Sequence, residues 1–309
     1  MIKKISPIIF GIFLIVLFEL SLCVAGKIFL LARNIEDIFL CDKKFTKLIY
    51  CVGDSHTFGV GVSGRYSYPK QLETLLNMNN PDITFKVVNL GIPGYSTERQ
   101  IDKSVAFFDR NRPDIVILLT GRNNYYEVKE WKNKSFLANA VVAIQKARTY
   151  RVMQYALNRL FKIESKEDMN TPSEERQYEN YINYQLLRIK SLCEKYNCKL
   201  LIISYYNSFD EPIEKFAKEA KVQYFNLCKD FQKAVPEKDI NRFISPDSSH
   251  MNLYGYKIFA ELLYKKMYLH REALNLKLKP LTRKINKDSY CQNPATYYLR
   301  YLQGKSVFY

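Results

Sequence analysis

Short hydrophobic runs rich in β-branched residues alternate with helical stretches through the middle of the chain. Five runs are predicted to be strands, at 48–52, 85–89, 115–119, 200–204 and 222–225. Between them, Ile101, Val105 and Phe108 follow the i, i+4, i+7 spacing of a helix face, and the same spacing runs from Ile182 to Ile189. Strands that alternate with helices predict a parallel sheet with helices on both faces, so we expect a functional site at the carboxyl ends of the strands.

The first of these helices carries a start signal. Thr97 and Gln100 have the spacing of a capping box, in which two side chains satisfy free backbone N–H groups. The sequence therefore predicts a helix that begins near residue 97.

A long apolar run precedes the alternating pattern. From Ile8 to Ala25 only Glu19 and Ser21 interrupt the hydrophobic residues, and this is the length of a membrane span. We expect residues 1–30 to form a signal-anchor transmembrane segment. A cleaved signal peptide is an open alternative, because small residues precede Gly26, and a buried core helix is another.

The remaining chain divides into three predicted parts. Residues 45–270 contain the alternating pattern, interrupted at about 125–176 by a long, basic, helical insertion that we interpret as a lid or docking element. Residues 271–309 form a basic, tyrosine-rich extension to which the sequence assigns no role. Because Lys3 and Lys4 precede the apolar run, we expect a single-pass membrane protein with its main domain outside the cytoplasm.

Composition and charge narrow the classes of function. The chain has 309 residues, of which 47% are hydrophobic, and a net charge of +16 that suits an anionic membrane surface or an acidic glycan. The basic residues are scattered and no nucleic-acid-binding motif accompanies them, so we expect no nucleic-acid partner. Seven cysteines include no pair with zinc-site spacing, and Cys51 and Cys228 lie in apolar runs. We predict no metal, no cofactor and no obligatory disulfide.

A candidate nucleophile follows the first predicted strand. Ser55 lies in a turn flanked by glycines, where a serine hydroxyl is exposed to a ligand. Of the three histidines, His56 adjoins this serine and should point away from it, and His270 ends a lysine-rich helical stretch. His250 lies in a polar loop before the last helix, with Asp247 three residues upstream to orient its imidazole. Alone, the serine and the aspartate are each also explained as helix caps.

Two further strand ends offer hydrogen-bond donors for an oxyanion. Gly94 follows the second strand and presents its N–H without a Cβ, and Asn123 follows the third strand with a side-chain amide. Each segment alone is also explained as an ordinary turn, but four such segments in this order favour a catalytic site.

These segments together resemble the SGNH (GDSL) hydrolase superfamily in its membrane-tethered bacterial form. The family blocks GDS, a glycine, GxND and DxxH correspond here to 53–55, Gly94, 121–124 and 247–250. The resemblance implies a flavodoxin-like, three-layer α/β/α fold with a five-stranded parallel sheet. It also implies the catalytic roles: Ser55 as nucleophile, His250 as base, Asp247 as its orienter, and an oxyanion hole from the Ser55 N–H, the Gly94 N–H and the Asn123 side chain. The third block departs from the family, because Asn124 replaces its aspartate.

The function implied is that of a serine esterase acting through an acyl-enzyme. We expect its substrates to be acyl or acetyl esters of surface or secreted polysaccharide, with lipid esters as the other class. An O-acyltransferase with the same three catalytic residues is an alternative, as is a non-catalytic carbohydrate-binding or scaffold protein that kept the fold. An intracellular thioesterase or lysophospholipase would require that the N-terminal segment is no export signal.

Overall fold

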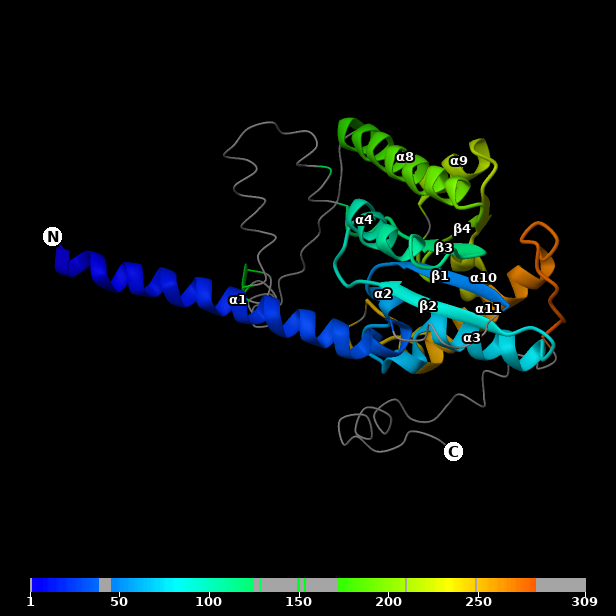
Figure 1. Cartoon of the computed structure of the whole chain (residues 1–309), viewed down its shortest axis with the longest axis horizontal. Coiled ribbons are helices and arrows are strands. Elements are labelled where there is room, and N and C mark those ends of the chain that lie inside the picture. Colours follow the sequence, from blue (N-terminus) through cyan, green and yellow to red (C-terminus); the bar gives the residue numbers. More distant parts are fainter. Residues whose placement is uncertain are drawn as a thin grey trace. The chain divides into compact units, whose positions relative to one another are not determined.

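Figure 1 shows the computed structural model of the chain. It describes residues 2–38, 46–124, 128, 149–150, 153, 172–208, 210–247 and 249–281. Almost all of the predicted insertion at about 125–176, and the predicted extension beyond residue 281, lie outside these described residues. The chain divides into two compact units, one of residues 1–42 with 124–181 and the other of 43–123 with 182–309, and each is described by itself.

The larger unit is built on one parallel sheet. Its strands are β1 (Lys47–Gly53), β2 (Phe85–Gly91), β3 (Ile115–Leu119), β4 (Lys199–Ile203) and β5 (Gln223–Phe225). Their order in the sheet is β2-β1-β3-β4-β5, and every neighbouring pair is parallel. This is the order of a flavodoxin-like fold, and the predicted fold class and five strands are confirmed. The chain passes from β1 outward to β2 and then back across to β3, so the topological switch point lies at the carboxyl end of β1.

Helices cover both faces of this sheet (Figure 1). One face carries α3 (Tyr68–Asn79), α10 (Leu227–Ala234) and α11 (Leu253–Leu269). The other carries α4 (Thr97–Phe108), the part of α8 (Pro172–Lys195) from Ile182 onward, and α9 (Glu211–Glu219). Three short helices, α2 (Ser55–Phe58), η2 (Gly64–Tyr66) and η3 (Glu237–Arg242), complete the described helices of this unit.

Alternate residues of the strands supply the two cores, as the pleat of a sheet requires. Ile49 and Cys51 of β1 point to the face covered by α3 and α11, while Tyr50 points to α4, where its ring contacts Phe108 edge-on. The predicted helix faces point inward: Ile101 and Phe108 of α4 are buried and Val105 is half-buried, and Ile182, Leu186 and Ile189 of α8 are buried. Cys51 and Cys228 are buried too, consistent with their predicted role as small hydrophobic residues.

The predicted capping box at the start of α4 is wrong. The N-cap residue is Ser96, with no side-chain capping bond, and the helix begins at Thr97. The Thr97 hydroxyl instead lies 2.6 Å from that of Thr120, and the Gln100 amide donates to the carbonyl of Tyr95. Thr97 and Gln100 therefore bond to the end of a neighbouring strand and to the preceding loop, and not to each other's backbone as a capping box requires.

Two paired glycines end β1 and β2 and make room for α2. Gly53 and Gly91 are partners in the sheet register. A Cβ on Gly91 would lie 2.2 Å from the backbone nitrogen of Phe58, and one on Gly53 would lie 2.1 Å from the Thr57 hydroxyl. Any side chain at either position would push α2 away from the sheet.

The smaller unit contains the N-terminal helix α1 (Ile2–Ile38). Its stretch Ile9–Ile28 has a mean hydropathy of 2.5 and no buried residue, which argues against the alternative of a buried core helix. At about 1.5 Å per residue it is long enough to cross a bilayer, although a signal sequence has the same properties. Within the apolar stretch, the Glu19 carboxylate accepts hydrogen bonds from the N–H and the hydroxyl of Thr149.

The residues that follow α11 are still packed into the core of the larger unit. Leu274, Leu276 and Leu278 are buried in the core beneath α3 and α11. The N–H of Lys279 donates to the Asn80 side chain at 2.7 Å. The first residues of the predicted extension are therefore part of the folded domain.

Candidate active site

Ser55 begins α2 directly after β1. The Asp54 carboxylate caps this helix by accepting the N–H of His56 at 2.9 Å. Gly59 ends the helix in the left-handed conformation, with φ of 82°, which glycine adopts without steric cost. The strand end, the cap and the glycine together turn the chain sharply and leave Ser55 at the carboxyl edge of the sheet, beside the switch point.

The loop before α11 brings His250 to this serine. Nε2 of His250 lies 2.8 Å from the Ser55 hydroxyl, and Nδ1 lies 2.6 Å from a carboxylate oxygen of Asp247. The structure thus brings together the three residues that the sequence singled out as nucleophile, base and orienter. In this arrangement Nδ1–H donates to the carboxylate, so Nε2 is free to accept the serine proton.

Asp247 is held by its own loop. Its other carboxylate oxygen accepts the N–H groups of Ser249 and His250, both at 3.0 Å. Burial opposes ionisation of this carboxyl, but the hydrogen bonds from His250 and Ser249 outweigh burial and lower the pKa of Asp247 to about 2. The group beside the imidazole is therefore a carboxylate at any pH at which the protein would work.

The predicted oxyanion donors lie at the ends of adjacent strands. Within the described residues, the N–H groups of Ser55 and Gly94 have no hydrogen-bond acceptor, and Gly94 has the left-handed φ of 73°. Nδ2 of Asn123 donates one proton to Asp54 at 3.1 Å, which leaves its second N–H available. Three donors at one sheet edge can serve a developing oxyanion.

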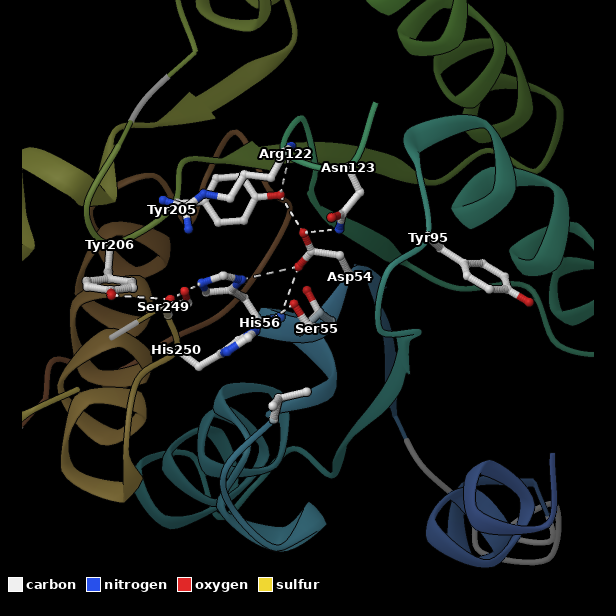
Figure 2. Close-up of polar contacts among 12 residues, drawn as sticks. Asp54, Ser55, His56, Tyr95, Arg122, Asn123, Tyr205, Tyr206, Ser249 and His250 are labelled. Atoms are coloured by element: carbon white, nitrogen blue, oxygen red, sulfur yellow. Dashed lines mark hydrogen bonds and ion pairs between the residues drawn. The ribbon is translucent and has the colours of Figure 1, made fainter. Parts of the chain in front are cut away.

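The buried carboxylate of Asp54 connects these elements (Figure 2). Besides capping α2, it accepts the Tyr205 hydroxyl at 2.8 Å and the Asn123 amide. Burial alone would raise the pKa of Asp54, but the hydrogen bonds and charge of His56, with the Tyr205 hydroxyl, lower it. Burial and the Asp54 charge raise the pKa of Tyr205, so its phenol remains a donor. One charge thus holds the ends of β1, β3 and β4 together.

The His56 ring lies beside that of His250 but makes no hydrogen bond to the Ser55 hydroxyl. Its Nε2–H donates to the carbonyl of Ser249 at 3.0 Å, and the two imidazole rings lie 4.8 Å apart. Its side chain is 3% exposed and also contacts the Tyr205 ring edge-on. His270, the third histidine, packs against Phe225 instead.

Four members of this site were not singled out from the sequence. Asp54 stood only within the GDS block, and His56 was set aside as a base. Tyr205 and Tyr206 follow β4, just beyond the predicted strand at 200–204, and their hydroxyls reach Asp54 and the Ser249 carbonyl. The signal available was the position of these residues at strand ends, the edge where a site was expected.

A family comparison identifies the kind of protein that has this geometry. The profile of the family described as GDSL-like lipase/acylhydrolase matches residues 49–263, more than half of the chain. The chain belongs to this family. It is an ester hydrolase of the SGNH type, and the predicted superfamily is confirmed.

Known structures resemble this GDSL-like hydrolase at low sequence identity. A psychrotrophic esterase from Pseudoalteromonas sp. matches with 12% identity and a TM-score of 0.48, over 74% of this chain and 99% of the esterase. A two-domain esterase active on acetylated mannans matches with 17% identity and a TM-score of 0.48, over 80% of this chain and 53% of that one. The lipase/acylhydrolase from Enterococcus faecalis matches with 17% identity and a TM-score of 0.44, over 77% and 100%. A comparison with curated protein sequences found no match.

The residue that departs from the family block lies inside the fold. Asn124 is 1% exposed, and its carbonyl accepts the N–H of Val128 at 2.9 Å. Asn124 follows Asn123, whose amide faces Asp54, in the loop after β3.

Proposed function

We propose that this GDSL-like hydrolase is a serine esterase that works through an acyl-enzyme. The observation that carries the proposal is the pair of distances at His250, 2.8 Å to the Ser55 hydroxyl and 2.6 Å to Asp247. A hydroxyl beside an oriented neutral imidazole is an activated nucleophile. The same distances speak against a non-catalytic scaffold, which has no need for an aligned base.

The chemistry follows from these contacts in two halves. Ser55 attacks the ester carbonyl carbon while its proton moves to Nε2 of His250, and the N–H groups of Ser55, Gly94 and Asn123 receive the oxyanion. The intermediate then expels the alcohol, which takes the proton from His250. Water, with His250 again as base, then attacks the acyl-enzyme in the same way and releases the acid and free Ser55. If a sugar hydroxyl replaces water in the second half, the same residues perform O-acyl transfer.

We further propose that α1 anchors the chain in a membrane, with the catalytic domain outside the cytoplasm. The apolar stretch Ile9–Ile28 supports an anchor by its length and hydropathy. A tethered esterase in that position would meet acyl or acetyl esters of surface or secreted polysaccharide. The net charge of +16 also fits an acidic polymer as the substrate.

Labelling with a fluorophosphonate probe tests the nucleophile. The full-length protein should react at one serine, mapped to Ser55 by mass spectrometry, and Ser55→Ala should abolish the reaction. His250→Ala should slow it strongly, because the hydroxyl loses its base. Ser63→Ala is the matched control, because Ser63 is an exposed serine before η2 with no side-chain capping bond. Labelling that persists in Ser55→Ala would disprove the proposal.

A further inference from the structure

An exposed cation lies in the loop that carries the Asn123 amide. The guanidinium of Arg122 stacks on the Tyr205 ring, with Cζ 4.6 Å from the ring centroid. Its Nη2 donates to the side-chain oxygen of Asn207 and to the hydroxyl of Ser208. Figure 2 shows Arg122 lying over Tyr205, on the same side of the network as Tyr206 and His250.

The guanidinium is held in place by groups that are themselves fixed. The Tyr205 ring beneath it is 3% exposed, and its hydroxyl is bonded to the buried Asp54 carboxylate. The backbone N–H of Arg122 contacts that same hydroxyl at 3.4 Å. A cation fixed in this way loses little conformational freedom when it binds a ligand.

The part of the chain that the structure describes supplies no carboxylate to neutralise the charge of Arg122. Some other cations of this unit pair with carboxylates, as Arg188 does with Asp102 and Lys47 with Asp114. Among the described residues no carboxylate pairs with Arg122, and its Nε and Nη1 have no hydrogen-bond acceptor. The charge reaches into the site, where it lowers the pKa of Tyr206 against the stronger effect of burial.

We propose that Arg122, Asn207 and Ser208 form a subsite for an oxyanion group of the substrate, a carboxylate or a phosphate. Arg122 offers charge and N–H donors, Asn207 keeps both protons of its amide, and Ser208 keeps its hydroxyl proton. The guanidinium stacks on Tyr205, whose hydroxyl binds Asp54, and its charge acts on Tyr206, so the anionic group would lie at the same edge of the sheet as the catalytic residues. The inference rests on the proposed esterase function and narrows its substrates to esters that carry a negative charge near the acyl group.

A different role for Arg122 makes a different prediction. If its contacts serve only to tie the loop after β3 to the loop after β4, removing the guanidinium should harm every substrate equally and lower thermal stability. A subsite instead changes the preference between charged and neutral substrates.

Three small acetyl esters with similar leaving groups separate these roles. They are 3-acetoxybenzoate, 3-acetoxyphenyl phosphate and the neutral 3-acetoxybenzamide, tested on the full-length protein. We expect kcat/KM to favour the anions, and the ratio of anion to neutral ester to fall about tenfold or more in Arg122→Gln. Arg122→Lys should give an intermediate ratio, and the two anions distinguish a carboxylate site from a phosphate site. Added NaCl should reduce the wild-type ratio, because salt screens an exposed charge.

The matched control is Arg271, which follows the end of α11. Its guanidinium stacks on the Tyr268 ring at 4.7 Å and donates to the Tyr268 carbonyl. Arg271→Gln should leave the ratio unchanged. The subsite is refuted if wild type shows no preference, if the preference survives in Arg122→Gln, or if both ester classes decline together. If no ester is hydrolysed, the esterase proposal fails. The subsite is then tested by titration calorimetry, which measures the affinity of Ser55→Ala for the charged and the neutral ester. Equal affinity for 3-acetoxybenzoate and 3-acetoxybenzamide would refute it.

Discussion

Replacing His56 by Phe should weaken the reaction modestly, because His56 acts on the loop that carries His250. Phe keeps the buried ring beside His250 and removes the hydrogen bond to the Ser249 carbonyl, now 3.0 Å long. Such a bond contributes about 0.5 to 1.5 kcal/mol net. Loss of this bond alone corresponds to a fall in kcat of about twofold to thirteenfold. His56→Phe also removes the contact between Nδ1 and the Asp54 carboxylate at 3.5 Å, so the measured fall includes any effect passed on through Asp54.

Two remaining contacts keep the effect on the loop small. The Ser249 carbonyl also accepts the Tyr206 hydroxyl at 3.3 Å, so it is not left without a donor. The hydrogen bond that His250 Nδ1 donates to Asp247 remains as well. Removal of the base itself would cost roughly 10,000-fold or more, so the two roles are well separated.

The assay is hydrolysis of a neutral aryl acetate at saturation, with thermal unfolding measured on the same preparations. His56→Gln, which keeps a donor, should lose less activity than His56→Phe. A loss in His56→Phe as large as that in His250→Ala would mean that His56 takes part in proton transfer. Unchanged kcat in a folded variant would mean that the bond to Ser249 does not position the loop.

Four other outcomes test the site and the topology. Asn123→Ala should lower kcat about 100-fold to 1,000-fold, the usual cost of one oxyanion donor, in steady-state kinetics. Ser55→Ala and His250→Ala should each remove nearly all turnover, and single-turnover assays of the double variant should give hardly less than either alone. The pKa of Asp247 is lower in the folded chain, about 2 against 3.8, so its carboxylate stabilises the fold above pH 3.8 and this contribution is lost toward pH 2. In urea titrations, the stability difference between wild type and Asp247→Asn should shrink over that window. Deleting residues 1–26 should release a soluble domain, and a periplasm-active reporter fused after residue 309 should give signal in the full-length protein.

The strands could be predicted because their apolar runs are short and bounded. The predicted runs lie within two residues of β1 to β5, since continuous burial in a parallel sheet leaves a clear signal in the sequence. Ser55, His250 and Asp247 could be predicted because a nucleophile needs a base and the chain has only three histidines. Scarcity, and positions at a strand end and in the loop before α11, made these residues candidates, and their catalytic roles stay predictions.

Long-range polar contacts could not be predicted in the same way. The bond from His56 to Ser249 joins residues 193 positions apart, and that from Tyr205 to Asp54 joins residues 151 apart. No local pattern marks such partners, because a tyrosine after an apolar run is equally suited to the core. The capping box failed for the same reason, since Thr97 found a partner on a neighbouring strand end.

The paired glycines at the ends of β1 and β2 have a consequence for how the specificity of this enzyme can change. Gly53 and Gly91 let the backbone of α2 pack directly against the edge of the sheet, so main-chain contacts determine the position of Ser55 relative to the strands. Arg122, the cation of the proposed subsite, stands on another loop, the one after β3. Exchanging it would alter which ester is accepted while the nucleophile stays where it is, so selection for a new substrate can proceed without rebuilding the reaction centre.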